Sequence, residues 1–149
     1  MNAKTILLVE DNPDDQRLTQ RALNKNNIAN TVVVAEDGAQ ALAYLFGTGE
    51  YADRDTSILP AVVLLDLNLP KIDGLTVLER IRADPRTRQL PVVILTSSIE
   101  EQDVSRSYQS GVNSYVRKPI DFVEFVAAAR QLGIYWLALN HPPPPGGGL

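Results

Sequence analysis

Five side chains suited to phosphoryl chemistry each follow an apolar segment of this 149-residue sequence. They are three carboxylates, one hydroxyl and one ammonium: Glu10, Asp11, Asp66, Thr96 and Lys118. Asp66 ends the most apolar of these segments, and burying an ionised carboxylate costs several kcal/mol unless a cation pairs with it. The sequence therefore predicts that a cation from elsewhere in the chain or from solution accompanies Asp66.

Three carboxylates that share one site repel one another, and a divalent cation relieves that repulsion. Carboxylate oxygens and water are the ligands that Mg²⁺ prefers, so Glu10, Asp11 and Asp66 predict a Mg²⁺ site. A carboxylate can also act as a covalent nucleophile towards phosphorus, while Mg²⁺ and an ammonium neutralise charge on the transferred group. We therefore interpret Asp66 as a phosphoryl acceptor, with the Lys118 ammonium and the Thr96 hydroxyl beside the phosphoryl oxygens.

This chemistry requires a fold that gathers distant positions at one place. Continuous apolar runs predict five strands, at 4–9, 31–35, 61–66, 90–95 and 113–116. Segments of helical periodicity alternate with them, at 12–26, 37–46, 73–84, 100–111 and from 120 onwards. Apolar runs without alternation are typical of parallel strands covered on both faces, so we predict an α/β fold with a doubly wound five-stranded parallel sheet. Such sheets bind ligands outside the carboxyl ends of their strands.

Four motifs at these strand ends resemble, in the same order, those of the receiver domain of two-component response regulators. They are "VEDN", "LLDLNLPKIDG", "LTSS" and "RKP". The resemblance extends from about Lys4 to Leu139. It implies the flavodoxin-like (βα)5 receiver fold, and transfer of a phosphoryl group from a sensor histidine kinase to Asp66 without the turnover of an enzyme.

The resemblance also implies a ligand set for Mg²⁺. Asp11, Asp66 and the backbone carbonyl of Asn68 would bind the ion directly, and Glu10 would act through a water molecule. Glu10 stands where many family members have Asp, and the longer side chain is compatible with the same role.

Three further roles follow from the resemblance. Lys118 would contact the phosphoryl group, and Thr96 would move towards that group after phosphorylation. Tyr115 would then rotate inward behind Thr96 as the switch aromatic. The Lys118–Pro119 peptide bond would be cis, an arrangement found in about 5–6% of X–Pro bonds.

Other interpretations of the same residues fit less well. A phosphatase of the haloacid dehalogenase type needs a second Asp two residues after its nucleophile, where this chain has Asn68. A calcium loop starting at Asp11 would need Gly and Glu where Gln16 and Ala22 stand. Asp14 and Asp15 follow the expected N-cap Asn12, so we interpret them as acids that favour a helix N-terminus rather than as ligands.

Composition restricts the remaining function classes. The formal net charge is −4 and no run of Lys and Arg occurs, which argues against nucleic-acid binding. The absence of cysteine excludes disulfides and thiolate sites. No apolar window reaches the ~18 residues of a membrane span, and no cleavable signal peptide is visible, so we expect a cytoplasmic protein. We expect a receiver domain over residues 1–140 and a flexible Pro/Gly-rich tail over 141–149, whose His141 is not a catalytic candidate.

The route of signal output is predicted from the last helix. We expect that no effector domain follows the receiver. This helix is apolar nearly all round, which is typical of a helix covered on more than one side. We therefore expect a homodimer through the last helix. The long 47–60 loop and the ending "YWLALNHPPP" resemble the small response regulators that partner cyanobacterial phytochromes and related kinases. A stand-alone receiver in chemotaxis or a phosphorelay remains the alternative.

Overall fold

The computed structural model describes residues 5–25, 30–96, 114–118 and 123. Its elements follow the chain in the order β1 (Ile6–Val9), α1 (Pro13–Lys25), β2 (Val32–Ala35), α2 (Gly38–Phe46), the 3₁₀ helix η1 (Gly49–Tyr51), β3 (Val62–Asp66), α3 (Gly74–Ala83), β4 (Val92–Thr96) and β5 (Ser114–Arg117). The helix expected over 100–111 falls outside the described residues, and of the helix expected after 120 only Val123, which is helical, is described.

The five strands form one parallel sheet in the order β2-β1-β3-β4-β5. The predicted five-stranded, doubly wound sheet is therefore confirmed. The chain proceeds from β1 to one side and then crosses to β3 on the other, so the strand order switches between β1 and β3. Ligands of such sheets bind at this switch, outside the carboxyl ends of the strands.

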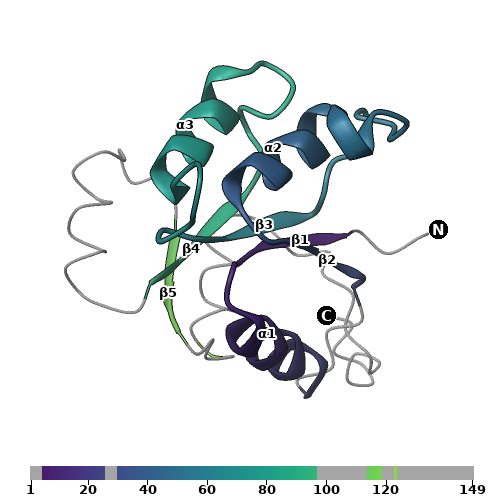
Figure 1. Ribbon diagram of the computed structural model, residues 1–149. Helices are drawn as coiled ribbons and strands as arrows, with labels where there is room; N and C mark the ends of the chain where they lie inside the picture. Colours follow the sequence, from purple (N-terminus) through teal and green to yellow (C-terminus); the bar gives the residue numbers. More distant parts are fainter. Residues whose placement is uncertain (1–4, 26–29, 97–113, 119–122, 124–149) are drawn as a thin grey trace, which may run out of the picture.

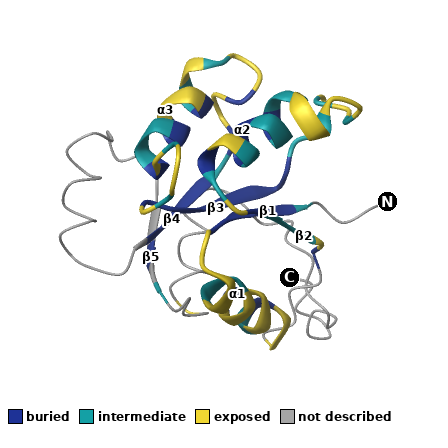
Figure 2. Ribbon diagram, in the orientation of Figure 1, coloured by how far each residue is buried: buried dark blue, intermediate teal, exposed yellow. Residues whose placement is uncertain are grey.

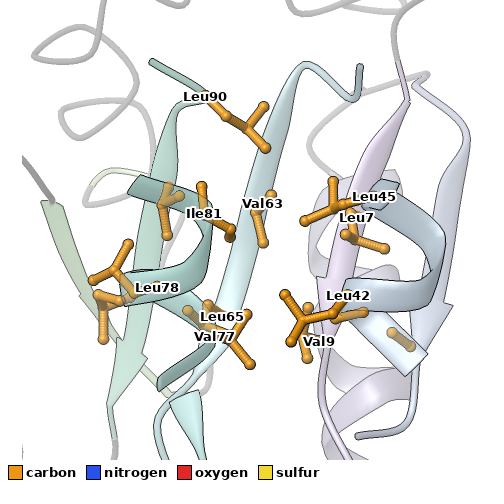
Figure 3. Close-up of a cluster of buried hydrophobic side chains, with 14 of the residues drawn as sticks. Leu7, Val9, Leu42, Leu45, Val63, Leu65, Val77, Leu78, Ile81 and Leu90 are labelled. Carbon is orange, nitrogen blue, oxygen red and sulfur yellow. The ribbon is translucent and has the colours of Figure 1, made fainter. Parts of the chain in front are cut away.

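Helices cover both faces of the sheet: α1 lies on one face, and α2 and α3 lie on the other (Figure 1). The described residues of β1, β3 and β4 are buried, whereas three of the four residues of β2 are only partly buried (Figure 2). Successive side chains of β1 point to opposite faces, so Leu7 and Val9 join the cluster under α2 and α3, whereas Ile6 and Leu8 join the cluster on the α1 side. Figure 3 shows the first cluster, in which Leu42 and Leu45 of α2 pack towards β1 and β3.

Three helices begin with a side-chain cap next to the carboxyl ends of the strands. Asn12 Oδ1 accepts hydrogen bonds from the N–H groups of Asp14 and Asp15, at 2.8 and 3.1 Å. Asp37 caps α2 and Asp73 caps α3 in the same way. The predicted N-cap Asn12 is therefore confirmed. Each cap satisfies orphan N–H groups of the first helical turn and fixes where the helix starts.

The 47–60 segment, expected to be a loop throughout, contains the 3₁₀ helix η1. Arg54 ties the segment to the end of α2, because its guanidinium donates to the carbonyls of Tyr44 (2.5 Å), Leu45 (3.4 Å) and Ile58 (2.8 Å). Among the described residues, no helix has both the length and the apolar character that crossing a membrane requires.

Candidate functional site

The register of β1 and β3 places the first two acids side by side. Val9 is paired with Leu65, and each is followed by a carboxylate residue, Glu10 and Asp66. Both are buried, with 0% and 2% of their surface exposed. Two adjacent carboxylates with almost no access to water need compensation, because each would otherwise lose its hydration without replacement.

Lys118 supplies that compensation from the end of β5. Its Nζ lies 3.1 Å from Asp66 Oδ2 and 3.2 Å from Glu10 Oε1. A third carboxylate oxygen, Oδ2 of Asp15 on α1, lies 3.2 Å away. An ammonium has three N–H donors, so these three carboxylates can satisfy all of them.

Asp11 completes an acidic cluster at the same edge. One carboxylate oxygen from each of Glu10, Asp11 and Asp66 lies within 4.8 Å of the others, and Asp11 is exposed while the other two are buried. This set of hard oxygen donors, open to water on one side, fits Mg²⁺, which keeps several water ligands when bound to protein. The cluster can therefore hold a divalent cation beside the Lys118 ammonium.

The local charges shift two pKa values. Burial, followed by the charge of Asp66, raises the pKa of Glu10 from 4.5 to about 7. Burial alone would lower the pKa of Lys118, but the carboxylates of Asp66 and Glu10 outweigh it and raise that pKa above its usual value. Lys118 is thus cationic at every physiological pH, whereas Glu10 can gain a proton near neutrality when no metal is bound.

Backbone groups hold the acids in place. The Asn12 N–H donates to Glu10 Oε2 at 3.2 Å, and the Asn68 N–H donates to Asp66 Oδ1 at 3.1 Å. Gly74, the first residue of α3, lies against the end of β3: a Cβ atom there would stand 2.4 Å from the Asp66 carbonyl oxygen. Only glycine lets α3 start this close to the acceptor strand.

The structure brings together Glu10, Asp11, Asp66 and Lys118, with Asn68 two residues beyond Asp66. Thr96 ends β4 at the same edge, where Asp66 is paired with Leu95. Tyr115 lies in β5, paired with Ile94. The side chains of Thr96 and Tyr115 and the whole of Pro119 fall outside the described part of the chain, as does the predicted cis peptide bond.

Asp15 is the residue of this site that the sequence interpretation missed. We assigned it to the helix N-terminus, but its carboxylate contacts Lys118. The available signal was its place in the first turn of α1, which starts at the edge where the strand-end acids gather.

A groove of about 650 Å³ lies away from this site. It is lined by residues 57–61, 85, 86 and 88–91, which precede β3 and β4. It therefore opens at the amino ends of the strands, whereas the acidic cluster lies at their carboxyl ends.

The response regulator receiver domain family matches residues 6–130. Response regulator Rcp1 of Synechocystis sp. is 40% identical over 134 residues, which cover 90% of this chain and 89% of Rcp1. The crystal structure of the Mn²⁺-bound form of Rcp1 has a TM-score of 0.69 at 38% identity, covering 95% of this chain and 99% of that one.

Two further solved structures are similar over most of the chain. The bacteriophytochrome response regulator AtBRR is 53% identical with a TM-score of 0.87, covering 95% of this chain and 100% of its own. The phosphorylated cyanobacterial phytochrome response regulator RcpA is 43% identical with a TM-score of 0.69, covering 91% and 94%. With the family match over residues 6–130, these likenesses show that the chain belongs to the response regulator receiver domain family.

Proposed function

We propose that this receiver accepts a phosphoryl group on Asp66 from a sensor histidine kinase in a Mg²⁺-dependent reaction. The observation that carries the proposal is the surroundings of Asp66. This buried carboxylate lies at the strand-order switch, contacts the Lys118 ammonium at 3.1 Å and shares an acidic cluster with Glu10 and Asp11. Such a combination of nucleophile, fixed cation and metal ligands is what phosphoryl transfer to a carboxylate requires.

The reaction is an in-line displacement at phosphorus. A carboxylate oxygen of Asp66 attacks the phosphorus of a phosphorylated histidine, a P–O bond forms, the P–N bond breaks, and the bonding pair leaves with the imidazole. The product on this chain is an acyl phosphate. Lys118 neutralises charge on the phosphoryl oxygens and needs no reorganisation, since it already stands beside Asp66.

Asp11, Asp66 and the Asn68 carbonyl are the proposed direct metal ligands, and Glu10 is proposed to act through a water molecule. A bound Mg²⁺ supplies additional neutralisation of the phosphoryl oxygens. Two observations support the choice of a divalent cation: the cluster of three carboxylate oxygens in this chain, and the Mn²⁺-bound form of the similar protein Rcp1. Thr96 and Tyr115, at positions that match the family motifs, are proposed to respond to the phosphoryl group.

The kinase partner is proposed to be of the phytochrome type. The likeness to AtBRR, named as a bacteriophytochrome response regulator, supports this at 53% identity. A kinase of a chemotaxis or phosphorelay system remains the alternative. We propose that the reaction takes place in the cytoplasm. We also propose that the receiver domain, residues 1–140, forms a homodimer through its apolar last helix, and that this contact is part of the output surface.

A labelling experiment tests the acceptor. The protein is incubated with phosphoramidate and Mg²⁺, and the phosphorylated residue is mapped by borohydride trapping and mass spectrometry. We expect one phosphoryl group on Asp66. No label should form when EDTA is present from the start of the incubation, and none should form in the Asp66→Asn variant. Labelling elsewhere in the wild type would overturn the proposal, and sustained release of phosphate over many turnovers would indicate a phosphatase instead.

The partner and the dimer need separate measurements. Purified phytochrome-type kinases should transfer phosphate to this chain faster than chemotaxis-type kinases do, and the reverse order would favour the alternative. Light scattering after size exclusion, with and without beryllofluoride, tests the dimer. A monomer in both states would contradict it.

A further inference from the structure

The third partner of Lys118 differs from the other two in its origin. Glu10 and Asp66 end strands, whereas Asp15 stands in the first turn of α1. We infer that Asp15 is a positioning residue for phosphoryl transfer, which holds the Lys118 ammonium in place beside Asp66. This inference rests on the proposed function of Asp66.

The contact with Asp15 completes the set of hydrogen-bond acceptors around the Lys118 ammonium. Lys118 Nζ has oxygens of three carboxylates at 3.1 to 3.2 Å, one for each N–H donor. A long lysine side chain has many rotamers, and each fixed contact removes some of that freedom. With 15% of its side chain exposed, Lys118 is held from three sides and cannot swing out to water without breaking all three contacts.

Asp15 is also the only one of the three partners outside the acidic cluster. Oxygens of Glu10 and Asp66 converge with Asp11 in the set that can hold a cation, and Asp15 is not a member of that set. Glu10 and Asp66 would interact with a cation in the cluster as well as with Lys118, and phosphorylation converts the Asp66 carboxylate into an acyl phosphate. Of the three partners, only Asp15 keeps a carboxylate that interacts with Lys118 and not with the cation or the phosphoryl group.

The neighbouring acid shows that the contact is not a general property of this helix start. Asp14 carries the same charge in the same turn, yet its carboxylate is 78% exposed and pairs with Arg17 one turn along α1. The Asp15 carboxylate is 34% exposed and faces Lys118. The two residues therefore share any interaction with the helix dipole, but only Asp15 reaches the site.

This difference provides a matched pair of variants. Asp15→Asn and Asp14→Asn each remove one negative charge from the first turn of α1. We expect Asp15→Asn to slow labelling of Asp66 by phosphoramidate at saturating Mg²⁺ on the order of five-fold, the size of a partly exposed charge-assisted contact. Asp14→Asn should label at the wild-type rate, and Asp15→Glu should recover part of the loss because it restores a carboxylate.

A double-variant experiment separates positioning from a general electrostatic effect. In a Lys118→Ala background, Asp15→Asn should cause no further slowing, because the group it holds is gone. Thermal unfolding of all variants checks that each is folded at the assay temperature. Mg²⁺ affinity, measured by calorimetry, should be the same in Asp15→Asn as in Asp14→Asn.

The outcomes distinguish this inference from the proposed function. If wild type is labelled on Asp66 but Asp15→Asn and Asp14→Asn behave alike, the positioning role is wrong and the proposed function stands. A slowing that persists without Lys118, or a Mg²⁺ affinity lowered only in Asp15→Asn, also overturns the positioning role. Absence of any label on wild-type Asp66 overturns both.

Discussion

Glu10 occupies unusual surroundings for an acid, since it is fully buried beside a second carboxylate. Its neighbour Lys118 offsets part of the cost, and a cation in the acidic cluster would offset more. Because burial and Asp66 raise the pKa of Glu10 to about 7, its charge state responds to pH in the range in which a cell operates. The residue thus links folding to proton uptake, and a cation bound in the acidic cluster would add a third linked equilibrium.

The first prediction concerns stability against pH in the metal-free protein. Between 4.5 and about 7 the folded state holds a proton on Glu10 that the unfolded state has released. Stability therefore falls as pH rises through this window, by an amount on the order of 3 kcal/mol, and levels off above it. Urea unfolding in EDTA from pH 5 to 8 measures the slope. Glu10→Gln should flatten it, and an unchanged slope in that variant would contradict the assignment.

At the scale of elements, capped helix starts position the segments at the carboxyl ends of the strands. The caps Asn12, Asp37 and Asp73 set the first turns of α1, α2 and α3. Lys71, in the segment between β3 and α3, adopts a φ of 65° and pairs with Asp37 at 3.3 Å. The two segments that follow β2 and β3 are therefore joined, which holds α3 close to Asp66.

The second prediction tests the approach of α3 to β3. In Gly74→Ala the new Cβ would meet the Asp66 carbonyl oxygen at 2.4 Å and the Leu67 Cα at 2.7 Å, both backbone atoms that cannot rotate away. We expect a loss of about 1–3 kcal/mol in unfolding free energy and slower labelling of Asp66, because the acceptor strand must shift.

Gly49→Ala is the control for that variant. Gly49 has a φ of 57° and open space around its Cβ position, so the substitution strains the backbone far from the site. It should cost about 1 kcal/mol in stability and leave the labelling rate unchanged. Equal labelling by both variants would show that Gly74 is needed for stability alone.

The third prediction concerns the end of α2. Arg54 donates to three carbonyls and its guanidinium lies 4.2 Å from the centre of the Tyr44 ring. Lysine cannot reproduce this planar fork, so Arg54→Lys should lower the unfolding free energy by about 1–2 kcal/mol without slowing phosphorylation. Urea unfolding measures the change in unfolding free energy. A variant as stable as wild type would show that Arg54 does not stabilise the segment after α2.

At the scale of the whole molecule, ligand binding and folding are linked. A cation that binds the folded acidic cluster and not the unfolded chain stabilises the fold by an amount set by its concentration relative to Kd. The fourth prediction is that Mg²⁺ at 100 times its Kd stabilises wild type by about 2.7 kcal/mol and Asp11→Asn by less. Thermal unfolding with and without Mg²⁺ measures this. Asp14→Asn should respond as wild type does, and an equal response from Asp11→Asn would exclude Asp11 as a ligand.

The sheet and the strand-end acids could be predicted because both depend on short-range rules. Continuous apolar runs identify buried parallel strands, and parallel strands bring Glu10, Asp66 and Lys118 to one edge whatever the details of packing. The contact of Asp15 could not be predicted in this way, since it depends on how α1 rotates and docks against the sheet. The three residues of η1 are too short a pattern to detect within a Gly-rich segment. The switch roles of Thr96 and Tyr115 stay predictions.

Lys118 reaches Glu10 across 108 positions of sequence, from the last strand of the sheet to the first. A nascent or truncated polypeptide that lacks this lysine would have no ammonium opposite its strand-end acids. Acceptance of phosphate would then report that synthesis has passed residue 118 and that the final strand has docked, so fragments and half-folded copies would not compete with intact molecules for the kinase.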